Sequence, residues 1–190
     1  MFNIKFKVFD EDLNEMKVMN LEEFEREFTS IYGNYCMSVE GEGYPYYLPD
    51  KLIFSNFEDS QLIDVHLNSL IYVVENLNKY DSFFIKYVEN SVTWLLIQKQ
   101  GNIILLSEIR KLYTVEMNNH LKGGYVITNK EFFNEVELIW GPISINLDEF
   151  VDEVINATHI LFKVIGEVNQ QFQRSCVMNK VFSFVNKTNV

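Results

Sequence analysis

Residues 83–109, FFIKYVENSVTWLLIQKQGNIILLSEI, decide the fold of this chain. Three runs rich in β-branched, aromatic and other apolar residues follow one another here, at 83–88, 92–98 and 103–109. Short turns separate them, first Glu89-Asn90 and then Gln100-Gly101-Asn102. Connections this short join antiparallel neighbours, because a parallel pair needs a crossover of about a dozen residues or more. The stretch therefore predicts an antiparallel β-meander.

The segments on either side of the meander predict one strand and two helices. Residues 2–9, FNIKFKVF, alternate apolar and polar side chains, as a half-buried strand does. Apolar residues at helical spacing predict a helix at about 21–32, with Asn20 as its N-cap and Gly33 as its stop. The clearest helical pattern begins at an Asn146–Glu149 cap pair and continues to about Val168.

Weaker signals fill the remaining segments. We expect an irregular loop at 35–50, short strands at 52–54, 62–67 and 112–117, and a helical stripe from 67 to about 80. A capping box from Thr128 to Glu131 predicts a short helix, and Gly141-Pro142 predicts a break in the chain. The order of elements predicts a single α+β domain over residues 1–190, with a mainly antiparallel sheet and helices packed on one face.

Composition restricts the class of protein. Hydrophobic residues make up 47% of the 190 residues and aromatic residues 15%, so the chain can bury a substantial core. The N-terminus has no basic segment followed by an apolar run, and no apolar run is long enough to span a bilayer. Cys36 and Cys176 suggest no disulfide framework, so we expect a cytoplasmic protein.

The charge predicts the kind of partner. The chain holds 27 acidic residues against 16 lysines and arginines, a formal net charge of -11. Such a field repels nucleic acid and anionic membranes and attracts basic proteins. The simpler interpretation, that the acidity only maintains solubility, stays open.

No residue pattern predicts a catalytic or metal site. His66, His120 and His159 are far apart, and neither an HExxH nor a CxxC spacing occurs. No nucleophile motif and no phosphate-binding loop occurs either. We therefore expect no metal, no cofactor and no enzymatic activity. The alternative is an enzyme whose carboxylates converge only in the folded chain.

Two acidic segments are the candidate partner-binding sites. In the last long helix, Asp148 and Glu149 are followed one turn later by Asp152 and Glu153, while the apolar residues between them take the buried stripe. The four acids form either a solvated face that complements the helix dipole or an acidic docking stripe.

The second candidate is the loop GEGYPYYLP at 41–49 with the residue before it. Rigid aromatic rings among acids are typical of protein interfaces. We expect tyrosine anchors and acidic steering charges at Glu40, Glu42, Tyr44, Tyr46 and Tyr47. The alternative is that these tyrosines fold back over the sheet as a lid.

The aromatic, acidic style of the chain resembles that of bacterial immunity proteins. The segments SVTWLLIQKQGNIILL at 91–106 and ELIWGPISINLDEFVDEVI at 137–155 carry the resemblance, which contains no diagnostic motif. Immunity proteins are encoded beside polymorphic toxins, often nucleases, and neutralise them by direct binding. The resemblance implies an acidic, non-enzymatic protein whose partner is a basic toxin domain. The alternative function is a small-molecule-binding or regulatory domain with an apolar aromatic pocket.

Overall fold

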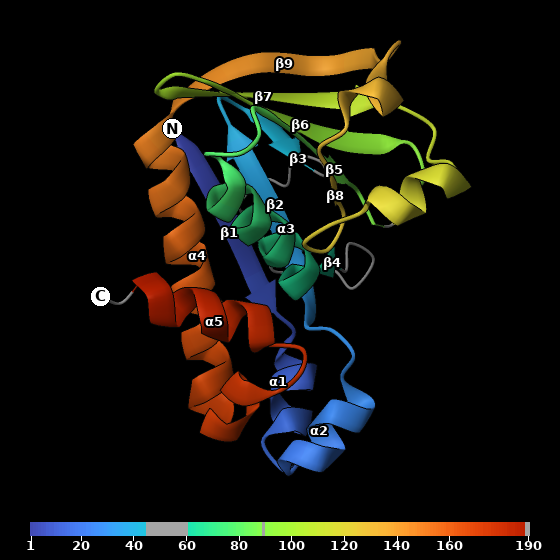
Figure 1. Cartoon of the computed structure of the whole chain (residues 1–190). Coiled ribbons are helices and arrows are strands. Elements are labelled where there is room, and N and C mark those ends of the chain that lie inside the picture. Colours follow the sequence, from blue (N-terminus) through green and yellow to red (C-terminus); the bar gives the residue numbers. More distant parts are fainter. Residues whose placement is uncertain (45–60, 89, 189–190) are drawn as a thin grey trace.

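The computed structural model describes residues 1–44, 61–88 and 90–188, and its antiparallel strands and helices form an α+β fold (Figure 1). This confirms the predicted class, but the strands form two sheets rather than one. The strands are β1 (Phe2–Val8), β2 (Tyr32–Val39), β3 (Glu42–Tyr44), β4 (Gln61–Leu62), β5 (Ser82–Lys86), β6 (Thr93–Gln100), β7 (Ile103–Arg110), β8 (Val126–Ile127) and β9 (Glu137–Asn146). The α-helices are α1 (Asp10–Met16), α2 (Leu21–Glu27), α3 (Ile63–Asn76), α4 (Leu147–Val168) and α5 (Asn179–Thr188), and the 3₁₀ helices are η2 (Val115–His120), η3 (Lys130–Phe133) and η4 (Gln170–Arg174).

The larger sheet is built around the predicted meander. Its strand order is β8-β5-β6-β7-β9, and every pair is antiparallel. The meander β5-β6-β7 is therefore confirmed. Strand β9 adds a long outer edge, because the chain returns to β7 after the segment that holds η2 and η3.

The smaller sheet has the order β1-β2-β3, with β4 also paired to β2. Its longest pairing is β1 with β2, which runs from Phe2 opposite Val39 to Val8 opposite Gly33. Strand β1 is thus an edge of this sheet, and α4 lies along it (Figure 1).

One hydrophobic core draws on both sheets. Helix α3 contacts β2 and β8, and α4 contacts β1, β7 and β9. The buried side chains of this core include Phe2, Ile4, Val39, Leu67, Ile71, Phe83, Ile97, Leu106, Phe150, Val154 and Leu161. A second, smaller cluster lies around Trp94, Phe84 and Phe133. Within the described residues, no helix combines the length and apolar character of a membrane span.

The predicted helix at 21–32 is shorter in the structure. Helix α2 ends at Glu27 because Phe28 is extended, with φ -106 and ψ 100, and β2 begins at Tyr32. Gly33 is not a helix stop. A Cβ atom at Gly33 would lie 2.1 Å from the backbone oxygen of Lys7, so glycine allows β1 and β2 to pair closely there.

Other local predictions need correction. Residues 35–44 of the predicted loop belong mainly to β2 and β3, and the predicted strand at 52–54 lies outside the described residues. Of the predicted strand at 62–67 only Leu62 is extended, at the end of β4, and Ile63 begins α3; the segment at 112–117 leads into η2. Helix α1 had not been predicted.

The Gly141-Pro142 bond does not break the chain. It is a cis peptide inside β9, which continues to Asn146. The predicted cap at Thr128 is also wrong, since Oδ1 of Asn129 accepts the hydrogen bond from the Glu131 amide that opens η3. Helix α4 confirms the predicted span, but Oδ1 of Asn146 accepts from the Asp148 amide at 2.7 Å. The Glu149 side chain is bonded elsewhere.

Candidate functional site

The hairpin between β2 and β3 carries two of the predicted acidic residues. Val39 pairs with Glu42, so Glu40 and Gly41 form a two-residue turn, with φ of 51 and 93. Positive φ at both turn positions is typical of the type I′ hairpin, whose twist matches that of the strands. Glu40 and Glu42 are both exposed.

Strand pairing brings this hairpin close to the start of α4. Phe2 pairs with Val39, and its backbone N–H donates to Oε1 of Glu149 at 2.8 Å. Because neighbouring strands lie about 4.8 Å apart, Glu42 and Glu149 are on the order of 15 Å apart. We call this group of predicted acids the acidic rim, which comprises Glu40, Glu42, Asp148, Glu149, Asp152 and Glu153.

Two members of the acidic rim have a structural role. Oε1 of Glu149 accepts from the Phe2 amide, and Oε1 of Glu153 accepts from the Ile4 amide, each at 2.8 Å. One turn of helix advances about as far as two residues of a strand, so the two pairs are in register. These carboxylates bind outward N–H groups that an edge strand otherwise leaves unpaired. They were expected as steering charges and are also the link between α4 and β1.

The other two acids of α4 are not bonded in this way. Asp148 and Asp152 are exposed, and neither carboxylate has an ion-pair or hydrogen-bond partner among the described residues. Asp148 lies in the first helical turn, where a carboxylate is stabilised by the helix dipole. Asp152 lies beyond that turn, so the dipole does not account for it.

Tyr44 does not fit the predicted role of a surface anchor. Only 1% of it is exposed, and its hydroxyl donates to the backbone oxygen of Ile85 at 3.3 Å. Its ring meets His66 and Tyr87 edge-on, at 6.4 and 6.2 Å between ring centroids. Burial lowers the pKa of His66 to about 4. This correction follows from the pairing of β3 with β2. Tyr46 and Tyr47 lie outside the described residues.

Sequence reasoning missed a buried glutamate near the acidic rim. Oε2 of Glu108 in β7 accepts a hydrogen bond from the indole N–H of Trp140 in β9, at 2.9 Å. Burial raises the pKa of Glu108, and the charge of Glu42 raises it further, against the lowering effects of Trp140 and Arg110. The sequence pattern that could have indicated its burial is its spacing, two residues after Leu106 and four after Ile104, because alternate residues of a strand share a face and these two face the core.

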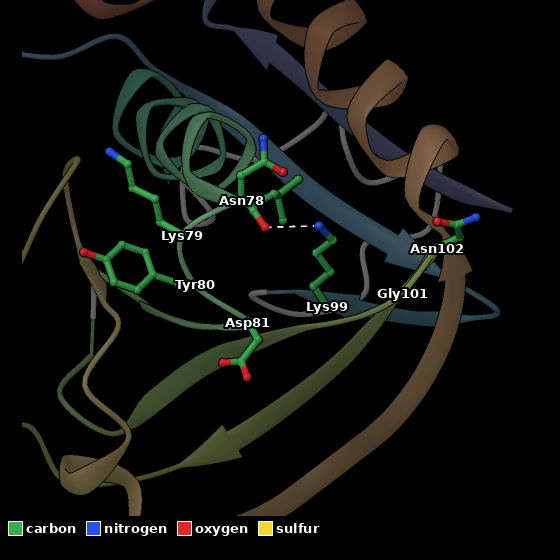
Figure 2. Close-up of a pocket in the computed structure, with 8 residues that line it drawn as sticks. Asn78, Lys79, Tyr80, Asp81, Lys99, Gly101 and Asn102 are labelled. Carbon is green, nitrogen blue, oxygen red and sulfur yellow. Dashed lines mark hydrogen bonds between the residues drawn. The ribbon is translucent and has the colours of Figure 1, made fainter.

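A groove runs past the acidic rim, between the end of α3, the turn from β6 to β7 and the start of α4 (Figure 2). Its first part has a volume of about 580 Å³ and its second about 490 Å³. Both parts share Leu77, Asn78 and Lys99. The first part is also lined by Lys79, Tyr80, Asp81, Gly101 and Asn102, and the second by Val74, Leu147, Asp148, Val151 and Asp152.

The charged groups of this groove differ in their bonding. Figure 2 shows Lys99 reaching toward the end of α3, where its Nζ donates to the backbone oxygen of Leu77 at 3.2 Å. Asp81 forms an ion pair with Lys130 at 2.8 Å. Asp152 lines this groove and also a hollow on the other side of α4, beside Phe2 and Glu149.

A second acidic region lies at the opposite end of β1. Between Asp10 and Glu27 the only bases are Lys17, just after α1, and Arg26 in α2. The acids of the two helices are Asp10, Glu11, Asp12, Glu15, Glu22, Glu23, Glu25 and Glu27. The pKa of Asp12 is raised by partial burial and by the charges of Glu15 and Glu11. A pocket beside the start of α2 is lined by Leu21 together with Gln170, Gln171, Gln173, Arg174 and Phe182, so its charged lining residue is a base.

Among the described residues, no group of three or more His, Cys, Asp or Glu side chains could hold a metal ion. No protein-family model, curated protein or solved structure matches this chain.

Proposed function

We propose that this protein is a non-enzymatic binding protein that captures a basic protein partner, as an immunity protein does with its cognate toxin. The observation that carries the proposal is the acidic rim, in which acids from residues 40–42 and 148–153 gather at one end of the smaller sheet. A basic nuclease domain is the partner that this charge fits best, since a cleft for phosphates carries the opposite field.

The acids contribute mainly to the rate and selectivity of binding. Exposed charges steer a partner of opposite sign, and this steering weakens as salt is added. Affinity needs buried anchors as well, within an interface of about 800 Å² per partner. Tyr46 and Tyr47 remain the proposed aromatic anchors, whereas Tyr44 is buried and cannot contact a partner. We further propose a cytoplasmic location, because Cys36 and Cys176 are both free thiols.

The test is a binding measurement with the toxin encoded beside the gene for this protein. The two purified proteins are mixed at micromolar concentration, and complex formation is followed by calorimetry for affinity and by stopped-flow fluorescence for association rate, at low and high salt. We expect one tight complex whose association rate falls with salt, and survival of cells that express both proteins. Absence of a complex, together with absence of protection, contradicts the proposal.

A matched pair of variants tests the role of the rim. E40Q/E42Q removes two rim charges, and E22Q/E27Q removes two charges from α2 at the other end of β1. We expect the first variant to slow association several-fold and the second to change it by less than about twofold, because steering depends on distance from the contact. Equal slowing by both variants assigns the effect to net charge alone.

A further inference from the structure

We infer that the groove beside Asp152 receives a lysine or arginine side chain of the basic partner. The inference rests on the proposed function and adds to it the chemical class of group that this part of the surface takes. It concerns the part of the groove where Val74, Leu77, Leu147 and Val151 form apolar walls and the polar lining is Asn78, Lys99, Asp148 and Asp152.

The acids of α4 differ in the interactions that account for their positions. Glu149 and Glu153 accept hydrogen bonds from β1, and Asp148 lies in the first turn of the helix. Asp152 has neither explanation, yet it lines hollows on both sides of α4. A carboxylate with no internal partner beside a half-apolar hollow is available to a cation from outside.

The walls of the groove fit the rest of such a side chain. Val74 and Leu77 come from the end of α3, and Leu147 and Val151 come from the start of α4. Lysine and arginine side chains lay their methylene stems along apolar surface and keep the charged head at its polar border. In this groove the stem would contact the two pairs of apolar residues, and the head would lie at Asp148 and Asp152.

Lys99 also lines this part of the groove, but its ammonium group is bonded at the end of α3 and not to the two carboxylates. Its Nζ is directed to the backbone oxygen of Leu77, and no ion pair joins it to Asp148 or Asp152 among the described residues. An anionic ligand would have to draw Lys99 away from the end of α3 and approach two carboxylates. The arrangement of charge therefore favours a cationic occupant over an anionic one.

The test uses the full chain and a defined probe, an acetylated and amidated tetra-arginine peptide, in an NMR titration of ¹⁵N-labelled protein. We expect saturable shifts at the amides of Asn78, Gly101, Asn102 and Val151. Tetra-lysine should shift the same amides, and tetra-glutamine should shift none of them. D148N/D152N should weaken tetra-arginine binding about five- to tenfold.

The matched control is E22Q/E27Q, which changes the net charge equally at the opposite end of the molecule. It should weaken binding less than about twofold. Equal weakening by both variants, shifts centred on α1 and α2, or no saturable shift overturns the inference. None of these results depends on the toxin. Peptide binding in the groove can therefore be absent while toxin binding is observed, and the reverse. The amide spectrum of D148N/D152N also reports whether that variant keeps its fold.

Discussion

The two long edge strands of this molecule, β1 and β9, are protected in different ways. The outward N–H groups of Phe2 and Ile4 in β1 are bound by Glu149 and Glu153, two carboxylates that come from a distant part of the chain. Strand β9 instead carries its protection within itself. Its register against β7 shifts on both sides of Glu108, and Pro142 has no N–H to offer.

The difference shows where acidity is structural and where it is available. Two of the four acids that α4 contributes to the acidic rim, Glu149 and Glu153, hold β1 in place. Their carboxylates therefore cannot be removed without loss of stability. Strand β9 needs no such help and leaves Leu138 exposed to 53%. An edge closed by distant carboxylates and an edge closed by its own irregularity should therefore respond differently to substitution.

The largest effect is expected at Gly33, which allows β1 to approach β2. In G33A the new Cβ would lie 2.1 Å from the Lys7 oxygen and 2.6 Å from Cδ1 of Ile63. We expect a loss of about 3 kcal/mol or more in the free energy of unfolding, because backbone has to move. Urea unfolding measures this, with S38A on the same strand as a control that should change little. A loss below about 1 kcal/mol means that the pairing can adjust.

Removal of the carboxylates that close β1 should have the next largest effect. E149A/E153A leaves the Phe2 and Ile4 amides without acceptors, at about 1–2 kcal/mol each. E149Q/E153Q keeps an acceptor at each site and should lose about half as much.

The matched control for these variants is D148A/D152A, which changes the same charge on the same helix. We expect it to lose less than about 1 kcal/mol, since it removes only helix-dipole stabilisation. Amide hydrogen exchange at Phe2 and Ile4 should speed up in E149A/E153A and not in the control. If both double variants lose equal stability, the hydrogen bonds from β1 to Glu149 and Glu153 contribute nothing to the free energy of unfolding.

The pH dependence of stability should report on the contact between Asp64 in α3 and Ile31, the residue before β2. Oδ1 of Asp64 accepts from the Ile31 amide at 2.8 Å, and burial raises the pKa of Asp64 to about 6, against the lowering effect of its hydrogen bonds. A raised pKa means that the folded state binds the proton more tightly. The contribution of this group to stability is therefore full below about pH 4 and is lost as pH rises through about 6.

The measurement is the free energy of unfolding of the natural protein and of D64N between pH 4 and pH 7.5. The natural protein should gain about 2 kcal/mol relative to D64N as the pH falls through this range. A constant difference between the two proteins would show that Asp64 titrates alike in the folded and unfolded states.

The smallest effect is expected on the exposed edge of β9. L138K should change the free energy of unfolding by less than about 0.5 kcal/mol, because the side chain is already largely in water. I145A on the same strand removes a buried side chain and should lose about 2–3 kcal/mol. A loss above about 1 kcal/mol in L138K contradicts the view that β9 needs no outside partner for its stability.

Regular elements were predictable where one local pattern decided them. The spacing of Phe150, Val154 and Leu161 predicts α4, and the short turns around β6 predict the meander. Prediction failed where the same residue type is typical of two different structures. Gly33 follows a helical pattern as a stop would, but the approach of Lys7, which decides its role, is a contact between strands.

The candidate site was predictable as a list of acids but not as a surface. Glu40 and Asp148 were chosen for their neighbours in sequence, and only the pairing of Phe2 with Val39 brings their segments together. Tyr44 was assigned to the surface because its neighbours are polar, whereas its place in β3 directs it into the core. Glu108 had no local signal of a polar role beyond its position in an apolar strand.

The sequence by itself determined the α+β class, the meander, the longest helix and the excess of negative charge, because periodicity, turn length and composition act over a few residues. The tertiary structure alone decided which carboxylates are bound and which are available. A carboxylate is held or released by the N–H group that meets it, and Phe2 and Ile4 meet Glu149 and Glu153 only once the chain has folded.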